Sequence, residues 1–378
     1  MLKTITPSLN KITKIIFNFI RIKTSKKITK YDGAILFSSH NHRYSDNSKH
    51  LYEYLRAKGY NVYYITDNQS CTDRIAPKSQ ELYSALKCCS AVCFTHTEKD
   101  IAFYIPKPVI RINLWHGSPI KKMGFDSPVD RKWLRKYSFI PRKNPYQRWH
   151  YIVIQSDLFK NAFISALQCS EHKLLDFGLP RNDVLGCAPP ELISRTYSEL
   201  GINQHSHNIL YAPTFRDSEF DIIAICESLK KLATQLPKSR LLIRLHPFDK
   251  SKIPGNFFTD TVIDANKVDD PQDLLNIADT LITDYSSIAF DYASLDRKII
   301  LYCPDYLEYA QARGGLYFEP KELPFIYCTN IQDVENALLI EGTYKYSTIY
   351  PQSQAKIHME NFLLEQNLLS KPNHEIKI

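Results

Sequence analysis

The 378-residue sequence lacks the features that define several large classes of protein. It contains no run of about 18 apolar residues, which argues against a membrane-spanning helix. Its 11 glycines and 21 prolines follow no period, which excludes a collagen-like chain. Hydrophobic residues make up 44% and charged residues 23% of the chain, so a disordered protein is also excluded. We therefore expect two or three globular domains with sizeable cores.

Familiar metal and nucleotide motifs are also missing. The nine cysteines are scattered, without zinc-finger spacing, and no secretory signal accompanies them, which predicts reduced thiols in a cytosolic protein. Neither a G-x-G-x-x-G segment nor a P-loop lysine motif is present, which weakens dinucleotide and ATP interpretations. We expect no metal site and no cofactor.

Acidic residues are absent from residues 1–30, which carry eight lysines and arginines. The rest of the chain balances 40 basic against 40 acidic residues, so the formal net charge of +8 lies in this segment. Its apolar residues recur at helical spacing: Leu9, Ile12, Ile16, Phe19 and Ile20. A basic amphipathic helix can lie on an anionic membrane leaflet, whereas the alternative is a helix packed on its own domain. We predict a membrane-surface arm over residues 1–30 and a peripheral location on the cytoplasmic face of the bacterial cell membrane.

Apolar segments bounded by turn residues alternate with helical patterns along the rest of the chain. Strands are expected at 33–38, 61–66, 91–95, 110–115 and 151–155, and again at 208–212, 241–245, 261–263, 280–283 and 298–302. Helices are expected at 48–58, 79–86, 220–235, 271–277, 287–295 and 331–340. Continuous apolar strands suit parallel sheets buried on both faces. We predict two doubly wound α/β domains, 31–200 and 201–345, that meet at a polar junction near 186–207 and face a cleft.

One histidine is expected at the rim of this cleft. The segment Asn113–Pro119 leaves a predicted strand and contains His116 followed by Gly117. Histidine is the usual side chain for taking a proton near neutral pH, and glycine lets the backbone turn sharply. The alternative is an ordinary loop histidine.

Three further segments of the second predicted domain carry groups that suit an anion. Thr214 and Arg216 follow one strand, and Arg244 and His246 lie on one side of another, because the strand period is two. A third strand leads into Asp284-Tyr285-Ser286-Ser287 and a helix, whose free N–H groups favour an anion. A surface salt bridge, a core histidine and a simple helix cap are the alternatives. Together with a base on the facing domain, these groups indicate a transferase that uses a nucleotide diphosphate.

These segments resemble the CDP-glycerol glycerophosphotransferase family, whose members prime and polymerise teichoic acids and related capsule polymers. The matching stretches are RYSDNSKHLYEYL (43–55), LWHGSPIKKMG (114–124), FGLPRND (177–183), ILYAPTFRD (209–217), LLIRLHP (241–247), LITDYSSIAFDYASLDRKIILYCPD (281–305) and EYAQARGGLYF (308–318). The resemblance extends from about residue 33 to 345.

The resemblance implies a GT-B-like fold, membrane association and a cytidine-nucleotide donor. It implies that His116 and His246 are the essential histidines, and that Arg244, Arg216 and Ser286–Ser287 lie at donor-phosphate positions. It also implies a C-terminal helix, for which 352–368 is suitable, that crosses back to the first domain and makes 346–378 a separate segment.

The reaction implied is the transfer of glycerol phosphate from CDP-glycerol to a hydroxyl of a membrane-linked acceptor, with release of CMP. His116 would take the proton of the acceptor hydroxyl, while His246, Arg244 and Ser286 would stabilise the diphosphate oxygens. Glu319 is a candidate ligand of the donor ribose, and Thr214 a further phosphate ligand.

Residues 121–150 carry nine lysines and arginines against two aspartates, with two tryptophans among them. The candidates for an acceptor or polyanion site are Lys121, Lys122, Arg131, Lys132, Arg135 and Lys136. A lipid-linked polyol-phosphate or saccharide acceptor at an anionic membrane suits such a cluster. Nucleic acid is the rival partner, but no nucleic-acid motif accompanies the cluster, and a solvated loop is the other alternative.

The sequence leaves other functions open. A CDP-ribitol phosphotransferase and a GT-B nucleotide-sugar glycosyltransferase would use a similar diphosphate site. A non-catalytic polyanion-binding module on the membrane is an alternative of another class, although binding alone needs no base such as His116. Primase versus polymerase activity, the acceptor linkage and the oligomeric state are not determined by these patterns.

Overall fold

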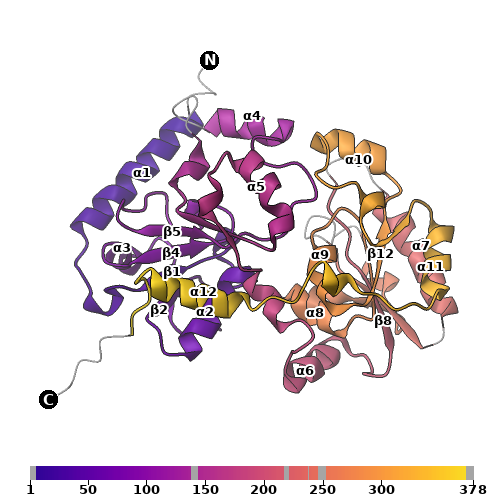
Figure 1. The fold of residues 1–378 in the computed structure, drawn as a ribbon. Coiled ribbons are helices and arrows are strands. Elements are labelled where there is room, and N and C mark those ends of the chain that lie inside the picture. Colours follow the sequence, from indigo (N-terminus) through magenta and orange to yellow (C-terminus); the bar gives the residue numbers. More distant parts are fainter. Residues whose placement is uncertain (1–5, 138–143, 217–220, 237, 246–252, 372–378) are drawn as a thin grey trace.

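The computed structural model describes residues 6–137, 144–216, 221–236, 238–245 and 253–371, without the side chains of 6–10, 133 and 135–137. Two α/β lobes lie side by side, and the chain passes from one to the other and finally returns (Figure 1). Each lobe is built on one sheet of parallel strands.

The first sheet has the strand order β3-β2-β1-β4-β5-β6-β7. Its strands are β1 (Ile35–Phe37), β2 (Val62–Ile65), β3 (Arg74–Ile75), β4 (Ala91–Phe94), β5 (Ile110–Asn113), β6 (Tyr151–Ile154) and β7 (Leu174–Asp176). The helices of this lobe are α1 (Thr6–Thr24), α2 (Asp46–Ala57), α3 (Gln80–Leu86), α4 (Pro128–Tyr137) and α5 (Lys160–Leu167).

The second sheet has the strand order β10-β9-β8-β11-β12-β13. Its strands are β8 (His207–Tyr211), β9 (Ser239–Ile243), β10 (Val262–Asp264), β11 (Thr280–Thr283), β12 (Lys298–Tyr302) and β13 (Ile326–Cys328). The later helices are α6 (Pro190–Leu200), α7 (Ile222–Gln235), α8 (Pro271–Ile277), α9 (Ile288–Tyr292), α10 (Tyr306–Arg313), α11 (Ile331–Leu339) and α12 (Ala355–Glu365).

The predicted fold class, a pair of doubly wound α/β domains, is confirmed. The central strands are apolar and buried, as in β1 and β4, where every residue is buried. The strands that the sequence did not predict are β3, β7 and β13, which are two or three residues long and lie at sheet edges. A short edge strand needs no continuous apolar run, so it leaves no such signal.

The segment predicted as the junction, 186–207, follows the turn Pro180–Val184 and leads into β8. That segment contains α6, which packs on α8 of the second lobe, with Arg195 Nη2 3.4 Å from Asp273 Oδ2. The turn Pro180–Val184 packs on α2 and α12 of the first lobe and on α8 of the second, and we call it the crossing turn. The domain boundaries at 200 and 345 remain predictions.

The two ends of the described chain both pack on the first lobe. On α1, Ile22 is buried and the Ser25 hydroxyl just beyond it donates to the Tyr83 carbonyl of α3 at 3.2 Å. On α12, Met359 and Leu363 are fully buried in the core that surrounds β1 and α2. No helix in the described ranges is both long enough and apolar enough to cross a membrane.

Candidate active site

His116 lies just beyond β5, at the carboxyl end of the first sheet, and is partly exposed. Its Nδ1 atom lies 2.9 Å from the carbonyl oxygen of Thr95. A carbonyl oxygen only accepts, so Nδ1 carries the proton and the Nε2 atom keeps its lone pair. Burial lowers the pKa of His116, which favours the neutral ring. The side chain is therefore held as a neutral imidazole whose Nε2 atom is ready to accept a proton.

Aromatic stacking fixes the plane of this imidazole. The ring of His96 stacks on that of His116, with centroids 3.8 Å apart and planes 11° apart, and His40 follows on the other side of His96 at 4.5 Å. The Trp115 ring lies 4.9 Å from His116. Burial, together with the two neighbouring imidazoles, lowers the pKa of His96 to about 2, so a second positive charge next to His116 is avoided.

Side chains donate hydrogen bonds to three successive main-chain carbonyls of the loop that carries His116. The Asn47 amide, at the start of α2, donates to the carbonyls of Leu114 at 3.1 Å and Trp115 at 3.0 Å. Arg181 Nη1 donates to the carbonyl of His116 at 3.0 Å. Trp115 has a φ of 58°, a left-handed conformation that is unfavourable for a bulky residue and needs such surrounding support.

Gly117 brings this loop against the second lobe. It has a φ of 151°, and a β-carbon there would lie 3.0 Å from Ser287 Cβ and closer still to Ser287 Oγ. The candidate base at His116 and the hydroxyl-bearing turn at Ser286–Ser287 therefore face each other across the lobes. This is the juxtaposition that a transferase of the predicted kind needs.

The turn at Ser286–Ser287 precedes α9, which is only five residues long and continues as a short 3₁₀ turn to Leu295. Ser286 Oγ accepts from the Ile288 N–H at 3.4 Å, so it acts in part as a local cap. Ser287 is partly exposed and makes no side-chain cap bond to α9. A hydroxyl in this state is available to a ligand phosphate.

Arg216 has partners that the sequence did not reveal. Its guanidinium contacts Asp305 at 2.7 Å and Asp284 at 2.8 Å, and only 4% of the side chain is exposed. Tyr285 and Tyr309 stack on each other beside it, with ring centroids 4.9 and 4.7 Å from its Cζ atom. A guanidinium held in this way has little capacity left for a phosphate, so its donor-phosphate role remains a prediction that this geometry does not favour.

Thr214 is tied to the same cluster. Its N–H donates to both carboxylate oxygens of Asp284, at 2.9 and 3.1 Å. Its hydroxyl oxygen is buried and has no hydrogen-bond partner among the described residues. A buried hydroxyl without a partner is unusual, and a phosphate oxygen is a group that could accept its hydrogen bond.

Arg244 follows β9 and is partly exposed, and its guanidinium donates to main-chain carbonyls beyond β10, including that of Asp269 at 3.0 Å. Burial lowers the pKa of Arg244, although the arginine remains charged at neutral pH. His246, the second predicted essential histidine, lies outside the described residues. Glu319 is partly exposed, precedes a short turn and accepts a hydrogen bond from the Tyr306 hydroxyl.

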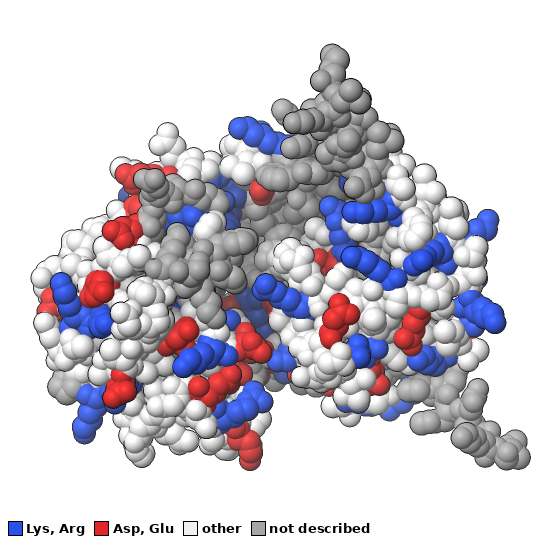
Figure 2. Space-filling view, turned by 180° about the vertical axis from the view of Figure 1, so that it is seen from behind, with Lys and Arg blue, Asp and Glu red and all other residues white. Residues whose placement is uncertain are grey.

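The predicted acceptor cluster divides into two parts. Lys121 and Lys122 pair with the segment after α10 of the second lobe: Lys121 bridges Leu316, and the Lys122 N–H donates to the Gly315 carbonyl at 3.1 Å. Arg131 and Lys132 are exposed on α4, whereas the side chains of Arg135 and Lys136 are not described. From behind, basic side chains gather on the upper part of the first lobe, beside the hollow between the lobes (Figure 2).

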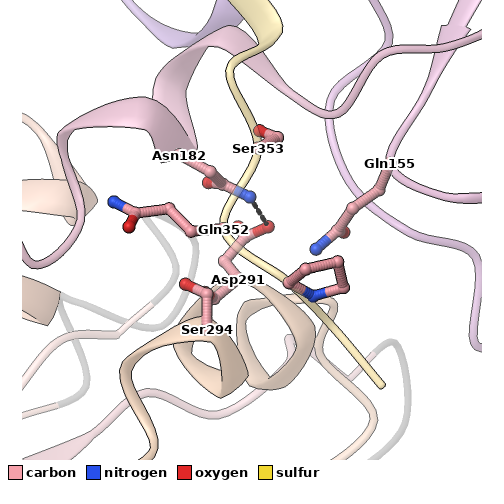
Figure 3. A pocket seen from close by; sticks show the side chains of 7 residues that line it. Gln155, Asn182, Asp291, Ser294, Gln352 and Ser353 are labelled. Carbon is pink, nitrogen blue, oxygen red and sulfur yellow. Dashed lines mark hydrogen bonds between the residues drawn. The ribbon is translucent and has the colours of Figure 1, made fainter. Parts of the chain in front are cut away.

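A small polar pocket marks the crossing between the lobes. It is lined by Gln155, Asn182, Asp291, Ser294, Pro351, Gln352 and Ser353, from the first lobe, the crossing turn, α9 and the returning C-terminal segment (Figure 3). The Asn182 amide donates to Asp291 Oδ1 at 2.8 Å. Neither His116 nor Ser286 nor Ser287 lines this pocket, and we do not assign the substrate to it.

Sequence reasoning missed the residues that support His116. His96 carries no motif of its own. Asn47, Arg181 and Asp291 lie within the three stretches 43–55, 177–183 and 281–305 that carried the family resemblance. Those stretches therefore contained the signal, but only the fold shows that they converge on one loop.

Two α/β lobes with parallel sheets, with the candidate base His116 on one and a hydroxyl-bearing turn of the other beside it, have the arrangement of a GT-B-like transferase. The sequence pattern of the CDP-glycerol:poly(glycerophosphate) glycerophosphotransferase family matches residues 18–358. The chain belongs to this family, and both the predicted family and the predicted class of enzyme are confirmed.

Individual relatives agree. The teichoic acid glycerol-phosphate transferase of Staphylococcus aureus is 31% identical over 346 residues, which cover 83% of this chain and 86% of that protein. The teichoic acid poly(glycerol phosphate) polymerase of Bacillus subtilis is 28% identical over 85% of this chain, but over only 46% of its own length. A variant of the wall teichoic acid polymerase TagF, solved after soaking with CDPG, has the same fold, with a TM-score of 0.76, 23% identity and coverage of 97% of this chain and 98% of that chain.

Proposed function

We propose that the protein transfers glycerol phosphate from CDP-glycerol to a hydroxyl of a membrane-linked acceptor and releases CMP, in the synthesis of a teichoic-acid-like or capsular polymer. One observation carries the proposal: His116, held as a neutral Nδ1–H imidazole, lies on the loop that touches Ser287 of the other lobe. A base on one lobe and a phosphate-binding turn on the other match a transfer across the cleft.

In this mechanism the acceptor hydroxyl oxygen attacks the glycerol-side phosphorus of the donor. The bond between that phosphorus and the oxygen of CMP breaks, and the hydroxyl proton passes to His116 Nε2. Ser286, Ser287 and Arg244 bind the diphosphate oxygens and stabilise the charge that develops on them. By its predicted role, His246 also stabilises the diphosphate oxygens, and Glu319 binds the donor ribose.

The reaction is tested with purified protein, CDP-glycerol or CDP-ribitol, and a lipid acceptor primed with glycerophosphate. We expect CMP release that depends on the acceptor and is faster with CDP-glycerol. Faster release with CDP-ribitol would assign the protein to ribitol phosphate transfer, and transfer of a sugar from a nucleotide sugar would make it a glycosyltransferase. Acceptor binding without any turnover would indicate that the protein is a non-catalytic polyanion-binding module. Parallel reactions with EDTA test the proposal that no metal takes part.

We further propose that α1 rests on the anionic surface of the membrane, at its cytoplasmic face. Asn18 and Ile22 of α1 are buried. Four large apolar side chains of the same helix are instead 43–51% exposed, namely Ile16, Phe17, Phe19 and Ile20. Apolar insertion and nearby lysines favour such binding, with roughly 1 kcal/mol from each basic residue close to the surface. A deletion of residues 1–27 would also remove the buried contacts of α1, so substitutions give the sharper test.

We expect the double variant Ile16→Ser, Ile20→Ser to bind anionic vesicles at least tenfold more weakly in a flotation assay. Raised salt should release the wild type in part. The matched control is Ile340→Ser, Ile349→Ser, because these side chains are 57% and 51% exposed on the second lobe. Equal vesicle binding by all three proteins would refute the role of α1.

A further inference from the structure

The crossing turn between the lobes contains an arginine that touches both sides of the site. Arg181 Nη1 donates to Asp46 Oδ1 at 2.7 Å and to the His116 carbonyl at 3.0 Å, while Nη2 donates to Asp291 Oδ2 at 2.8 Å. The side chain of Arg181 is 11% exposed, and those of Asp46 and Asp291 are 18% and 3% exposed. One guanidinium thus joins the base loop of the first lobe to helix α9 of the second.

The loop end of this connection is a strained segment that needs support. Trp115 is left-handed, and the carbonyls of residues 114, 115 and 116 are all held by Asn47 or Arg181. Asn47 and Arg181 also bind each other, because the Arg181 N–H donates to Asn47 Oδ1 at 3.1 Å. The main-chain position of the loop that carries His116 is therefore held by Asn47 and Arg181.

The other end of the connection is close to the donor turn. Asp291 lies on α9, four residues after Ser287, and also accepts from Asn182 at 2.8 Å (Figure 3). A parallel link runs through Gln155: the Ser118 hydroxyl donates to its Oε1 atom, and its Nε2 atom donates to the Phe290 carbonyl of α9 at 3.1 Å. Both links join the loop after β5 to the helix after the donor turn.

We propose that Arg181 is a positioning residue that sets the register of the His116 loop against the donor turn of the opposite lobe. Its fork is suited to this task, because it contacts a carboxylate on each lobe and a loop carbonyl at once, which a single ammonium group does not reproduce. This inference rests on the proposed function, because a register between base and donor matters only for a transfer between the lobes.

The alternative is that the ion pairs of Arg181 with Asp46 and Asp291 only stabilise the fold. Three measurements distinguish this structural role from a positioning role. Arg181→Lys keeps the charge and loses the fork, and Asp291→Asn removes the charge on the other lobe while keeping the shape. We measure kcat, donor Kd by calorimetry, and amide hydrogen exchange of the segment 113–118. The control is Arg56→Lys, since Arg56 forms a surface pair with Asp73 with side chains 41% and 43% exposed.

We expect kcat to fall by about 10- to 100-fold in Arg181→Lys, since a shift of about 1 Å at the reacting groups costs on this scale, with donor Kd within twofold of wild type. Exchange of 113–118 should accelerate at least tenfold in this variant and remain unchanged in Arg56→Lys. If Arg181→Lys does not fold, Asp291→Asn is judged by the same criteria.

A kcat within twofold of wild type, or a parallel loss of kcat and donor affinity, would overturn the inference. So would unchanged exchange of the segment 113–118. If the wild type itself releases no CMP from either CDP-polyol, it is the proposed function that fails, and the exchange measurement still decides whether Arg181 orders the loop.

Discussion

The two sides of the cleft are built in different ways. On the first lobe, the hydrogen-bonding groups around His116 already have partners. Side chains donate to three successive carbonyls of its loop, and the ring Nδ1 donates to the Thr95 carbonyl. The His96 ring stacks on the His116 ring. On the second lobe, the Thr214 hydroxyl is buried without a partner among the described residues, and Ser287 makes no cap bond to α9.

Under the proposed function, this difference makes the first lobe the side that is complete before the donor binds. A base must be held in one tautomer and one plane, so its contacts are made by the protein itself. A phosphate site must present hydrogen-bond donors that are unpaired until the ligand binds. Changes on the first lobe should therefore reduce turnover, and changes on the second lobe should reduce donor affinity.

The largest effect is expected at the base. His116→Ala should lose about 10²- to 10⁴-fold in kcat while donor affinity stays within about twofold, because general-base catalysis contributes on this scale. Calorimetry and CMP release measure the two quantities, and His172→Ala, an exposed histidine of the same lobe, is the control. Near-normal turnover of His116→Ala would show that His116 is not the general base.

Arg216 offers a test of whether every basic residue of the second lobe serves the donor. Removing a buried partner leaves Asp284 and Asp305 unpaired, so Arg216→Met should lower the free energy of unfolding by about 3–5 kcal/mol. Urea unfolding measures this, with Arg56→Met as the surface control. Unchanged stability together with weakened donor binding would instead assign Arg216 to the donor phosphate, as the sequence suggested.

A smaller effect is expected at the donor turn. Ser286→Ala, Ser287→Ala should weaken binding of CDP-glycerol about thirtyfold, because two hydrogen bonds of roughly 1 kcal/mol each are lost. The free energy of unfolding should change little, since Ser286 makes only one long cap bond. The control is Ser228→Ala, since Ser228 is partly exposed on α7 and bonds only within that helix. Equal affinity of the wild type, the double variant and this control for CDP-glycerol would show that Ser286 is only a helix cap.

A pH-dependent effect is expected at the histidine stack. Because the pKa of His96 is lowered to about 2 by burial, the unfolded chain takes up a proton below about pH 6.5 that the folded chain does not. The neutral His96 therefore makes its full contribution to the free energy of unfolding above pH 6.5. This contribution declines as the pH falls, by up to about 1.4 kcal/mol per pH unit. His96→Phe keeps an aromatic ring and removes the titration, so its stability should depend less on pH between 6.5 and 4.5. An identical pH dependence would show that His96 titrates normally.

The sequence predicted the two-domain architecture because the central parallel strands are continuous apolar runs. It also placed His116 and Ser286–Ser287 at strand ends, and the structure brings these two segments together. Three of the four edge strands, β3, β7 and β13, gave no such signal, because a strand of two or three residues with one solvated side need not be an apolar run.

The supporting residues could not be predicted for a different reason. Whether a buried arginine faces a ligand, as predicted for Arg216, or two carboxylates depends on Asp284 and Asp305, which are 68 and 89 residues away. Arg181 likewise meets Asp46 and Asp291 only because the lobes come together at the crossing turn. Such long-range pairing is a property of the fold rather than of any local pattern.

The central claim is that His116 acts as a neutral base facing a donor held by the other lobe. The pH dependence of kcat/KM for CDP-glycerol tests it most directly, because this profile reports the pKa of the free enzyme's base. Burial lowers the pKa of His116, so the account predicts a rate that stays level through pH 6.5 and falls with unit slope only at lower pH. The residual rate of His116→Ala should lack this acidic limb. The same acidic limb in His116→Ala would contradict the account.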